Sequence, residues 1–186
     1  AIVNAWYPGE QGGTAVADVL FGDYNPAGRL PLTYYKSLDE LPAFDDYDIT
    51  KGRTYKYFKG DVLYPFGYGL SYSSFKYSDL KVKDGANTVS VSFRLKNTGK
   101  RKGDEVAQVY VRIPETGGVV PIKELKGFRR IPLKSGESRV VEIELDKEQL
   151  RYWDAGLGRF IVPQGAFDIM VGASSKDIRL QTVINL

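Results

Sequence analysis

From about Phe75 to the end of the chain, apolar and polar residues alternate with a period of two. Successive side chains of a strand point to opposite faces, so this pattern predicts strands with one buried and one polar face. The apolar positions of the clearest runs are Val89, Val91, Phe93 and Leu95; Val109, Val111 and Ile113; Val141, Ile143 and Leu145; and Phe167, Ile169 and Val171. These residues are the predicted core.

Short polar turns separate the alternating runs. They are Asn97-Thr98-Gly99, Lys134-Ser135-Gly136-Glu137 and Pro163-Gln164-Gly165. About seven strands at this spacing, with no long helix, indicate an antiparallel β-sandwich of the immunoglobulin or fibronectin type III-like kind. The predicted fold class is therefore mainly β, and a small β-barrel is the alternative.

The first part of the chain has a different pattern. Residues 2–6 (IVNAW) are expected to form a short strand, and residues 14–21, after a Gly-rich loop, a helix with a wide apolar face. Thr14 is expected to cap that helix, and Gly22 to end it in the left-handed conformation. This order is typical of an α/β sheet, so residues 1–33 are predicted to be the end of an α/β domain.

Residues 34–73 show little regular period and contain many Gly, Pro, Asp and Tyr residues. A long stretch without a pattern is unusual inside a compact domain. We expect it to be a connector that lies across neighbouring domains, with its aromatic side chains as anchors. The predicted organisation is thus an α/β remnant at 1–33, a connector at 34–73 and a β-sandwich at 74–186.

Composition excludes several classes of chemistry. The 186 residues include no Cys and no His, which rules out disulfides, Cys-based zinc sites and a Ser-His-Asp triad, and removes the commonest metal ligand. The 26 Lys and Arg against 23 Asp and Glu give a net charge of +3, spread along the chain without a nucleic-acid or membrane footprint. No apolar run approaches the roughly 18 residues that cross a bilayer. We expect no cofactor and no metal, and any catalysis would use carboxylates, Lys, Arg or Tyr.

Two polar loops carry candidate chemistry. Residues 8–13 (PGEQGG) open the predicted helix like a phosphate cradle, but they lack a P-loop lysine, so a tight strand-to-helix turn is favoured. Glu10 is favoured there by the helix dipole whatever its role. Acidic residues cluster at 39–40 and 45–48. Glycosidic hydrolysis needs two carboxylates that face each other across the bond, which neighbours in sequence do not supply. Calcium binding needs a loop with spaced ligands, which these runs lack. A solvated acidic turn is therefore the favoured interpretation.

Residues 52–60 (GRTYKYFKG) interleave basic and aromatic side chains. Such a stretch suits interdomain packing or the neighbourhood of a sugar site, and gives poor support for nucleic-acid binding. In an extended segment Arg53, Tyr55 and Tyr57 would lie on one side. These three are the candidate substrate-rim or interdomain residues.

The chain opens directly in the strand-like residues 2–6, and its one methionine is Met170. A mature terminus seldom opens inside a strand that looks buried. We therefore expect a fragment of a longer polypeptide, with a processed N-terminus as the alternative.

Six stretches in the right order resemble one enzyme family. They lie at residues 6–13 (WYPGEQGG), 17–23 (ADVLFGD), 25–31 (NPAGRLP), 63–72 (LYPFGYGLSY), 123–128 (KELKGF) and 171–175 (VGASS). The first three resemble the end of the second catalytic-core domain of glycoside hydrolase family 3. The fourth resembles that family's passage into its C-terminal fibronectin type III-like domain, and the last two resemble signatures inside that domain.

The resemblance implies the C-terminal part of a retaining, exo-acting β-glycosidase that removes β-linked sugars from non-reducing ends. It implies a nucleophilic Asp in a barrel domain and an acid/base, usually a Glu, earlier in the α/β domain. Both are then expected upstream of Ala1, and no catalytic residue in this chain. The segment at 52–58 looks more like the β-xylosidase and related β-glucosidase branches.

The implied partners are the upstream barrel and α/β domains and, through them, an oligo- or disaccharide, in the periplasm or outside the cell. The segment itself would brace the catalytic core. The alternative is a stand-alone carbohydrate-binding or adhesion module. Such a module should carry an exposed aromatic platform on one sandwich face, whereas a bracing domain should keep its aromatic residues in the connector and the core.

Overall fold

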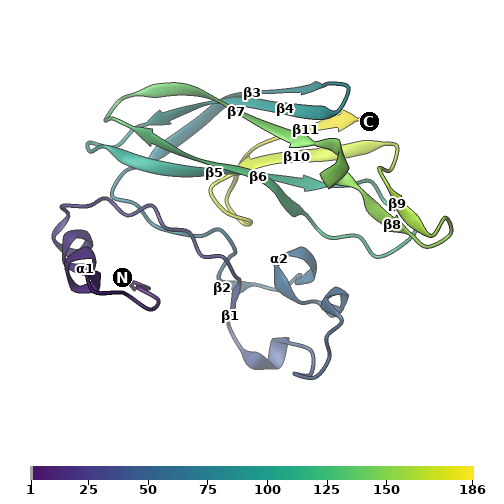
Figure 1. Ribbon diagram of the computed structural model, residues 1–186, viewed down its shortest axis with the longest axis horizontal. Coiled ribbons are helices and arrows are strands. Elements are labelled where there is room, and N and C mark those ends of the chain that lie inside the picture. Colours follow the sequence, from purple (N-terminus) through teal and green to yellow (C-terminus); the bar gives the residue numbers. More distant parts are fainter. Residues whose placement is uncertain (1) are drawn as a thin grey trace.

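The computed structural model describes residues 2–186. Residues 75–186 form two packed antiparallel sheets, and residues 2–73 lie along the outer side of one of them (Figure 1). The elements in chain order are α1 (Gly12–Phe21), β1 (Tyr34–Tyr35), η1 (Leu38–Glu40), η2 (Ile49–Lys51), α2 (Thr54–Tyr57), β2 (Val62–Tyr64), β3 (Phe75–Asp84), β4 (Thr88–Asn97), β5 (Gly103–Arg112), β6 (Glu124–Leu133), β7 (Ser138–Asp146), η3 (Lys147–Leu150), β8 (Tyr152–Asp154), β9 (Arg159–Ile161), β10 (Ala166–Gly172) and β11 (Ile178–Asn185), where η is a 3₁₀-helix.

Seven long strands build the β-sandwich. One sheet has the order β11-β10-β5-β6 and the other the order β3-β4-β7, with antiparallel pairing throughout. The prediction of a mainly β sandwich is confirmed, because two separate sheets face each other and no barrel closes. Every predicted core residue is at most 7% exposed. The alternation found in the sequence therefore marks the faces that pack together.

The outer face of the four-stranded sheet is also covered. Gln108 and Tyr110 point away from the core, yet they are 3% and 0% exposed. Gln108 Nε2 donates to the carbonyl oxygens of Gly67 at 3.1 Å and Ala173 at 2.7 Å, while the Tyr110 hydroxyl donates to Gln108 Oε1 at 2.5 Å. The connector thus packs on this face, and the buried polar groups find partners there.

A buried ion pair joins the N-terminal part to the sandwich. Arg29 Nη2 lies 3.0 Å from Glu105 Oε2, and the two side chains are 9% and 4% exposed. The hydroxyl of Tyr77, from the opposite sheet, donates to Glu105 Oε1 at 2.8 Å. Burial raises the pKa of Glu105 above its usual value, and the charge of Arg29 opposes that rise. Arg29 therefore compensates a carboxylate that water does not reach.

Two expectations for the first residues are wrong. Residues 2–6 form no strand, because no neighbouring strand among the described residues offers them backbone hydrogen bonds. The helix α1 begins at Gly12, so Thr14 lies inside it and does not cap it. Gly22 does end α1 in the left-handed conformation, with φ 86°. No residue of α1 is buried, so the described residues cover its apolar face only in part.

The connector contains more local structure than its pattern suggests. β1 and β2 pair as a small antiparallel hairpin, and η1, η2 and α2 lie between them. Residues 54–57, expected to be extended, form the single helical turn α2. Among residues 2–186, no helix has the length and apolar character of a membrane span. The domain boundaries after residues 33 and 73 stay predictions.

We predict that Arg29→Met lowers the free energy of unfolding of the chain by roughly 3–5 kcal/mol at neutral pH, because it leaves Glu105 buried without its counter-charge. Urea unfolding measures this loss. Arg94→Met, which removes the exposed pair with Asp79, is the matched control and should cost much less.

The same variant predicts a pH dependence. A carboxyl whose pKa is raised in the folded state stabilises the fold at low pH, and that contribution is lost as the pH rises through the raised pKa. Without Arg29 the pKa of Glu105 rises further. The difference in free energy of unfolding between the unchanged chain and Arg29→Met should therefore shrink as the pH is lowered from neutral to about pH 5. A difference that stays constant over this range would contradict the role assigned to Glu105.

Hydrogen exchange should separate the two parts of the chain. Amides in β4, β5 and β10 should exchange only on global unfolding, while α1 amides should exchange at least about tenfold faster because no α1 residue is buried. Mass spectrometry of the exchanging chain measures both. Uniform protection would show that α1 belongs to the same cooperative unit.

Candidate functional site

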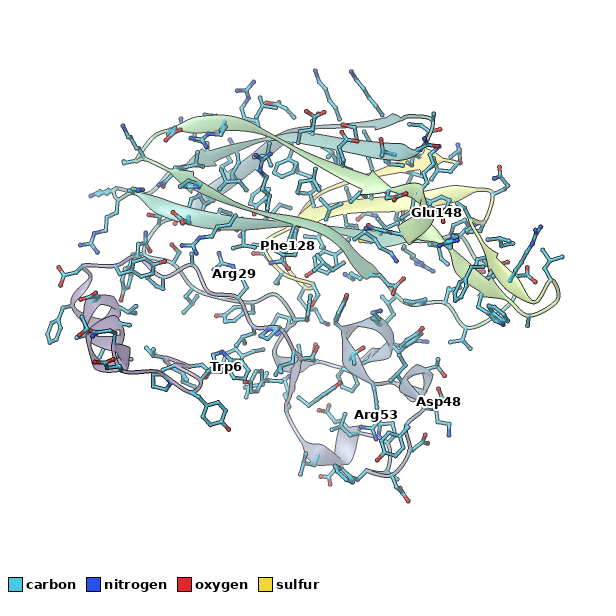
Figure 2. The ribbon with its side chains drawn as sticks, in the orientation of Figure 1. Trp6, Arg29, Asp48, Arg53, Phe128 and Glu148 are labelled. Carbon is cyan, nitrogen blue, oxygen red and sulfur yellow. The ribbon has the colours of Figure 1, made fainter. Side chains whose placement is uncertain are left out.

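The three predicted rim or interdomain residues lie on and next to the short helix α2. Arg53 precedes the helix, and its guanidinium donates to the carbonyl oxygens of Pro42, Ala43 and Asp46 at 2.6–3.2 Å. In Figure 2 Arg53 lies in the lower part of the connector, near Asp48. Arg53 therefore folds the loop before it and does not share one face with the two tyrosines.

Tyr55 fastens the connector to the sandwich. Its hydroxyl accepts a hydrogen bond from the Leu125 backbone N–H at 3.0 Å. Its ring stacks on Phe66 with centroids 4.3 Å apart and meets the edge of Tyr110 at 5.9 Å. Burial raises the pKa of the Tyr55 hydroxyl above its usual value. Tyr55 thus spans a contact between connector and sheet, whereas contact with upstream domains stays a prediction.

Charged groups beside Tyr55 strengthen the same junction. Lys56 Nζ lies 2.6 Å from Glu124 Oε1, and Lys126 Nζ lies 2.9 Å from Glu124 Oε2. Burial opposes ionisation of Glu124, but the hydrogen bonds from the two lysines outweigh it, so its pKa lies below the usual value. Tyr57 is half-buried nearby, and burial followed by the Glu124 charge raises its pKa.

Sequence reasoning missed the Lys56–Glu124 pair. Glu124 belongs to the KELKGF stretch, which was noted only as a family signature. Its partner lies 68 positions earlier, and no periodic pattern reports a contact over that distance. The alternation of charged and aromatic residues at 52–60 is the one local signal for the segment that contains Lys56.

The acidic clusters shape loops. Asp46 accepts from Lys51 at 2.7 Å, and Asp48 accepts from the Thr50 backbone N–H at 3.0 Å. Hydrogen bonds from Lys51 and Thr50, respectively, hold the pKa of Asp46 and of Asp48 below the usual range. Within residues 2–186, no group of three or more acidic side chains could hold a metal ion. These carboxylates are ionised loop caps and lack the raised pKa of a general acid.

The Gly-rich loop forms a tight turn. The Gly12 N–H donates to the Gly9 carbonyl at 2.9 Å, which closes the loop on itself. A Cβ at Gly12 would collide with the ring of Pro8, so glycine is required where α1 begins. Gln11, before the helix, makes no capping bond, and Glu10 lies within the turn. The loop therefore serves the chain reversal and presents no phosphate cradle of its own.

An apolar surface around α1 has no cover within the described residues. Tyr7 is 99% exposed and Phe21 is 84% exposed. A shallow hollow of about 440 Å³ lies between residues 3–12 and the α1 side chains Val16 and Val19. Figure 2 shows Trp6 on the same side of the sandwich as Phe128, a β6 side chain that is 67% exposed. Surfaces of this kind mark contacts with other protein.

Two family models match the chain. Residues 1–72 match the glycosyl hydrolase family 3 C-terminal domain, and residues 105–175 match the fibronectin type III-like domain. The second match lies in the sandwich, and the first covers α1 and the connector. The two matches follow each other in the order in which the sequence motifs occur.

Several relatives match nearly the whole chain. A xylan 1,4-β-xylosidase of Xylanibacter ruminicola is 47% identical over 98% of this chain, and a periplasmic β-glucosidase of Salmonella typhimurium is 38% identical over 96%. β-Glucosidase 3B from Thermotoga neapolitana in complex with glucose matches 97% of this chain with a TM-score of 0.90 and 36% identity. The chain spans 21%, 25% and 27% of the lengths of these proteins.

Substitutions at Tyr55 test the junction. Tyr55→Phe removes only the hydrogen bond to Leu125 and should lower the free energy of unfolding by about 1 kcal/mol. Tyr55→Ala also removes the stack on Phe66 and should cost roughly 1–3 kcal/mol. Thermal and urea unfolding measure both. Tyr47→Ala, at a side chain that is 86% exposed, is the control expected to change nothing. If Tyr55→Ala is as stable as the unchanged chain, residues 52–60 are merely a solvated loop.

Proposed function

The chain belongs to glycoside hydrolase family 3, of which it carries the C-terminal portion, and on that premise we propose that it is part of a retaining, exo-acting β-glycosidase. The parent enzyme would hydrolyse β-linked sugars at the non-reducing ends of oligo- or disaccharides. The observation that carries this proposal is the 47% identity to a xylan 1,4-β-xylosidase over 98% of the chain. The chemistry would be done by carboxylates outside this segment.

We favour a β-xyloside as the substrate over a β-glucoside. The β-xylosidase is more similar to this chain than the β-glucosidase from Salmonella typhimurium, at 47% against 38% identity. Residues 52–58 resemble both the β-xylosidase and the related β-glucosidase branches, so this preference rests on the difference in identity alone. The periplasm or the cell exterior is the proposed location, supported by the periplasmic name of that second relative.

The segment's own role would be structural. Arg29, Tyr55 and Gln108 hold residues 2–73 against the sandwich through an ion pair, an aromatic stack and hydrogen bonds. The uncovered apolar face around α1 would then dock on the preceding part of an α/β domain. The segment would support that domain from one side, and the upstream domains would carry out the reaction.

The distribution of exposed aromatic residues favours bracing over a stand-alone sugar-binding module. Of the exposed aromatic side chains, those on residues 2–73 are Trp6, Tyr7, Phe21, Tyr24, Phe44, Tyr47 and Tyr72, and those on the sandwich are Phe128, Trp153 and Phe160. Trp153 and Phe160 lie on the β8–β9 hairpin and meet edge to face at 71°. Two crossed rings do not offer the flat platform on which a sugar stacks.

We predict that the 186-residue chain alone hydrolyses no aryl β-xyloside or aryl β-glucoside. Its one buried carboxylate, among the described residues, is Glu105, which is neutralised by Arg29 and hydrogen-bonded to Tyr77. Release of the aryl alcohol, followed by absorbance, should match buffer. Turnover above buffer by a clean preparation would contradict the assignment of catalysis to the rest of the enzyme.

The parent enzyme provides the positive arm of that experiment. It should cleave an aryl β-xyloside with retention of anomeric configuration, seen by proton NMR before mutarotation, and with a higher kcat/KM than for the aryl β-glucoside. Inversion, or activity on α-linked substrates only, would overturn the proposed function.

A further inference from the structure

A cleft separates the connector from one end of the four-stranded sheet. Its volume is about 500 Å³, which lies within the range of small-molecule sites. The connector supplies one wall with Phe58 and Lys59, the loop between β5 and β6 supplies Lys123, and the loop between β10 and β11 supplies Lys176. In Figure 1 that last loop, in yellow, runs toward β2 and α2.

Hydrogen bonds fix the walls of this cleft relative to one another. The Ile122 backbone N–H donates to the Lys56 carbonyl at 2.7 Å, and the Ser175 backbone N–H donates to the Phe66 carbonyl at 2.9 Å. Lys123 Nζ donates to the Ser175 carbonyl at 2.8 Å, which ties two walls directly. The cleft is therefore a preformed feature of the fold.

The charged residues that line the cleft are all cationic. They are Lys59, Arg112, Lys123 and Lys176, and no Asp or Glu lines it. Arg112 has a distant partner in Glu115 at 3.8 Å. None of the ion pairs formed within residues 2–186 includes any of the three lysines. No ion pair within the described residues therefore neutralises the charge of these three lysines.

The carboxylates nearest in sequence are all engaged elsewhere. Asp61 pairs with Lys36, Glu124 with Lys56 and Lys126, and Asp177 with Arg179. The pKa of Lys123 is lowered by burial and by the charge of Lys176, so the two ammonium groups repel each other. An anion between them would relieve that repulsion.

Part of the lining of the cleft is apolar and aromatic. Phe58 and Tyr55 line it together with Pro121. A ring with one charged substituent matches such a site, because its face can pack on the aromatic wall while its charge meets the lysines.

We propose that this cleft binds an organic anion whose carboxylate or phosphate group lies among Lys59, Lys123 and Lys176 and whose ring packs against Phe58. A sugar acid of one or two rings is the member of this class that fits the volume. The anion site stands on the charges and the geometry alone. The choice of a sugar as the carrier rests on the proposed glycosidase function.

The experiment titrates the ¹⁵N-labelled 186-residue chain with D-glucuronate, inorganic phosphate or D-glucose and follows amide shifts by NMR. We expect saturable shifts at residues 58–60, 122–123 and 175–176 with glucuronate, with a dissociation constant of about 1 mM or tighter, and none with glucose. If phosphate binds as tightly as glucuronate, the anionic group alone accounts for the affinity. If phosphate binds more weakly, the ring of glucuronate contributes to the affinity as well.

Charge variants decide whether the cleft is responsible. Lys59→Gln with Lys176→Gln removes two exposed, unpaired charges and should weaken binding about tenfold, equivalent to about 1.4 kcal/mol. Lys83→Gln with Lys96→Gln makes the same change of charge on the other sheet and should leave affinity within about twofold. Equal losses in both double variants, or no saturation with either anion, would overturn the proposal. Because binding is measured on this chain and hydrolysis on the parent enzyme, each proposal can fail without the other.

Discussion

The buried pair of Arg29 and Glu105 is the constraint on which the arrangement of the two parts depends. A carboxylate inside a sandwich is strongly unfavourable unless a counter-charge reaches it. The counter-charge that hydrogen-bonds this carboxylate comes from Arg29, 76 positions earlier in the chain. The sandwich and the segment before it therefore stabilise each other, although their hydrophobic patterns indicate separate domains. Tyr77 adds a hydrogen bond from the second sheet, so three distant segments meet at one carboxylate.

The outer face of the four-stranded sheet follows the same logic. Gln108 and Tyr110 lie where a solvated sandwich would expose polar groups, and both are buried under the connector. Gly67 makes this approach possible, since its φ is 81° and a Cβ there would collide with the Gln108 side chain. The glycine of the Tyr-Pro-Phe-Gly stretch is thus required by a specific contact. The sheet is covered on both faces at Gln108 and Tyr110, whereas antiparallel sheets commonly leave one face to water.

The sequence predicted the sandwich core well because alternation is a local consequence of strand geometry. Val91, Val109 and Ile169 could be identified without knowing their partners. The strand predicted at residues 2–6 does not form, since a strand exists only when a neighbouring strand offers hydrogen bonds. Residues 54–57 failed because tertiary contacts decide so short a segment: the Tyr35 hydroxyl accepts from the Thr54 backbone N–H at 2.6 Å. In the candidate site, Tyr55 was selected because residues 52–60 interleave basic and aromatic side chains. Its hydrogen bond to Leu125 joins residues 70 positions apart, and no local pattern predicts such a contact.

The apolar face around α1 and the cationic cleft differ in whether their contact with water is favourable. The apolar face around α1 exposes Phe21 and Tyr7, whose contact with water is unfavourable until another protein surface covers them. Lys59 and Lys176 of the cleft are exposed to water, so a small anion can enter and leave. Arg29, Tyr55 and Gln108 each fasten the residues before the sandwich to it. These contacts determine how rigidly residues 2–73 hold the sandwich against whatever docks at α1.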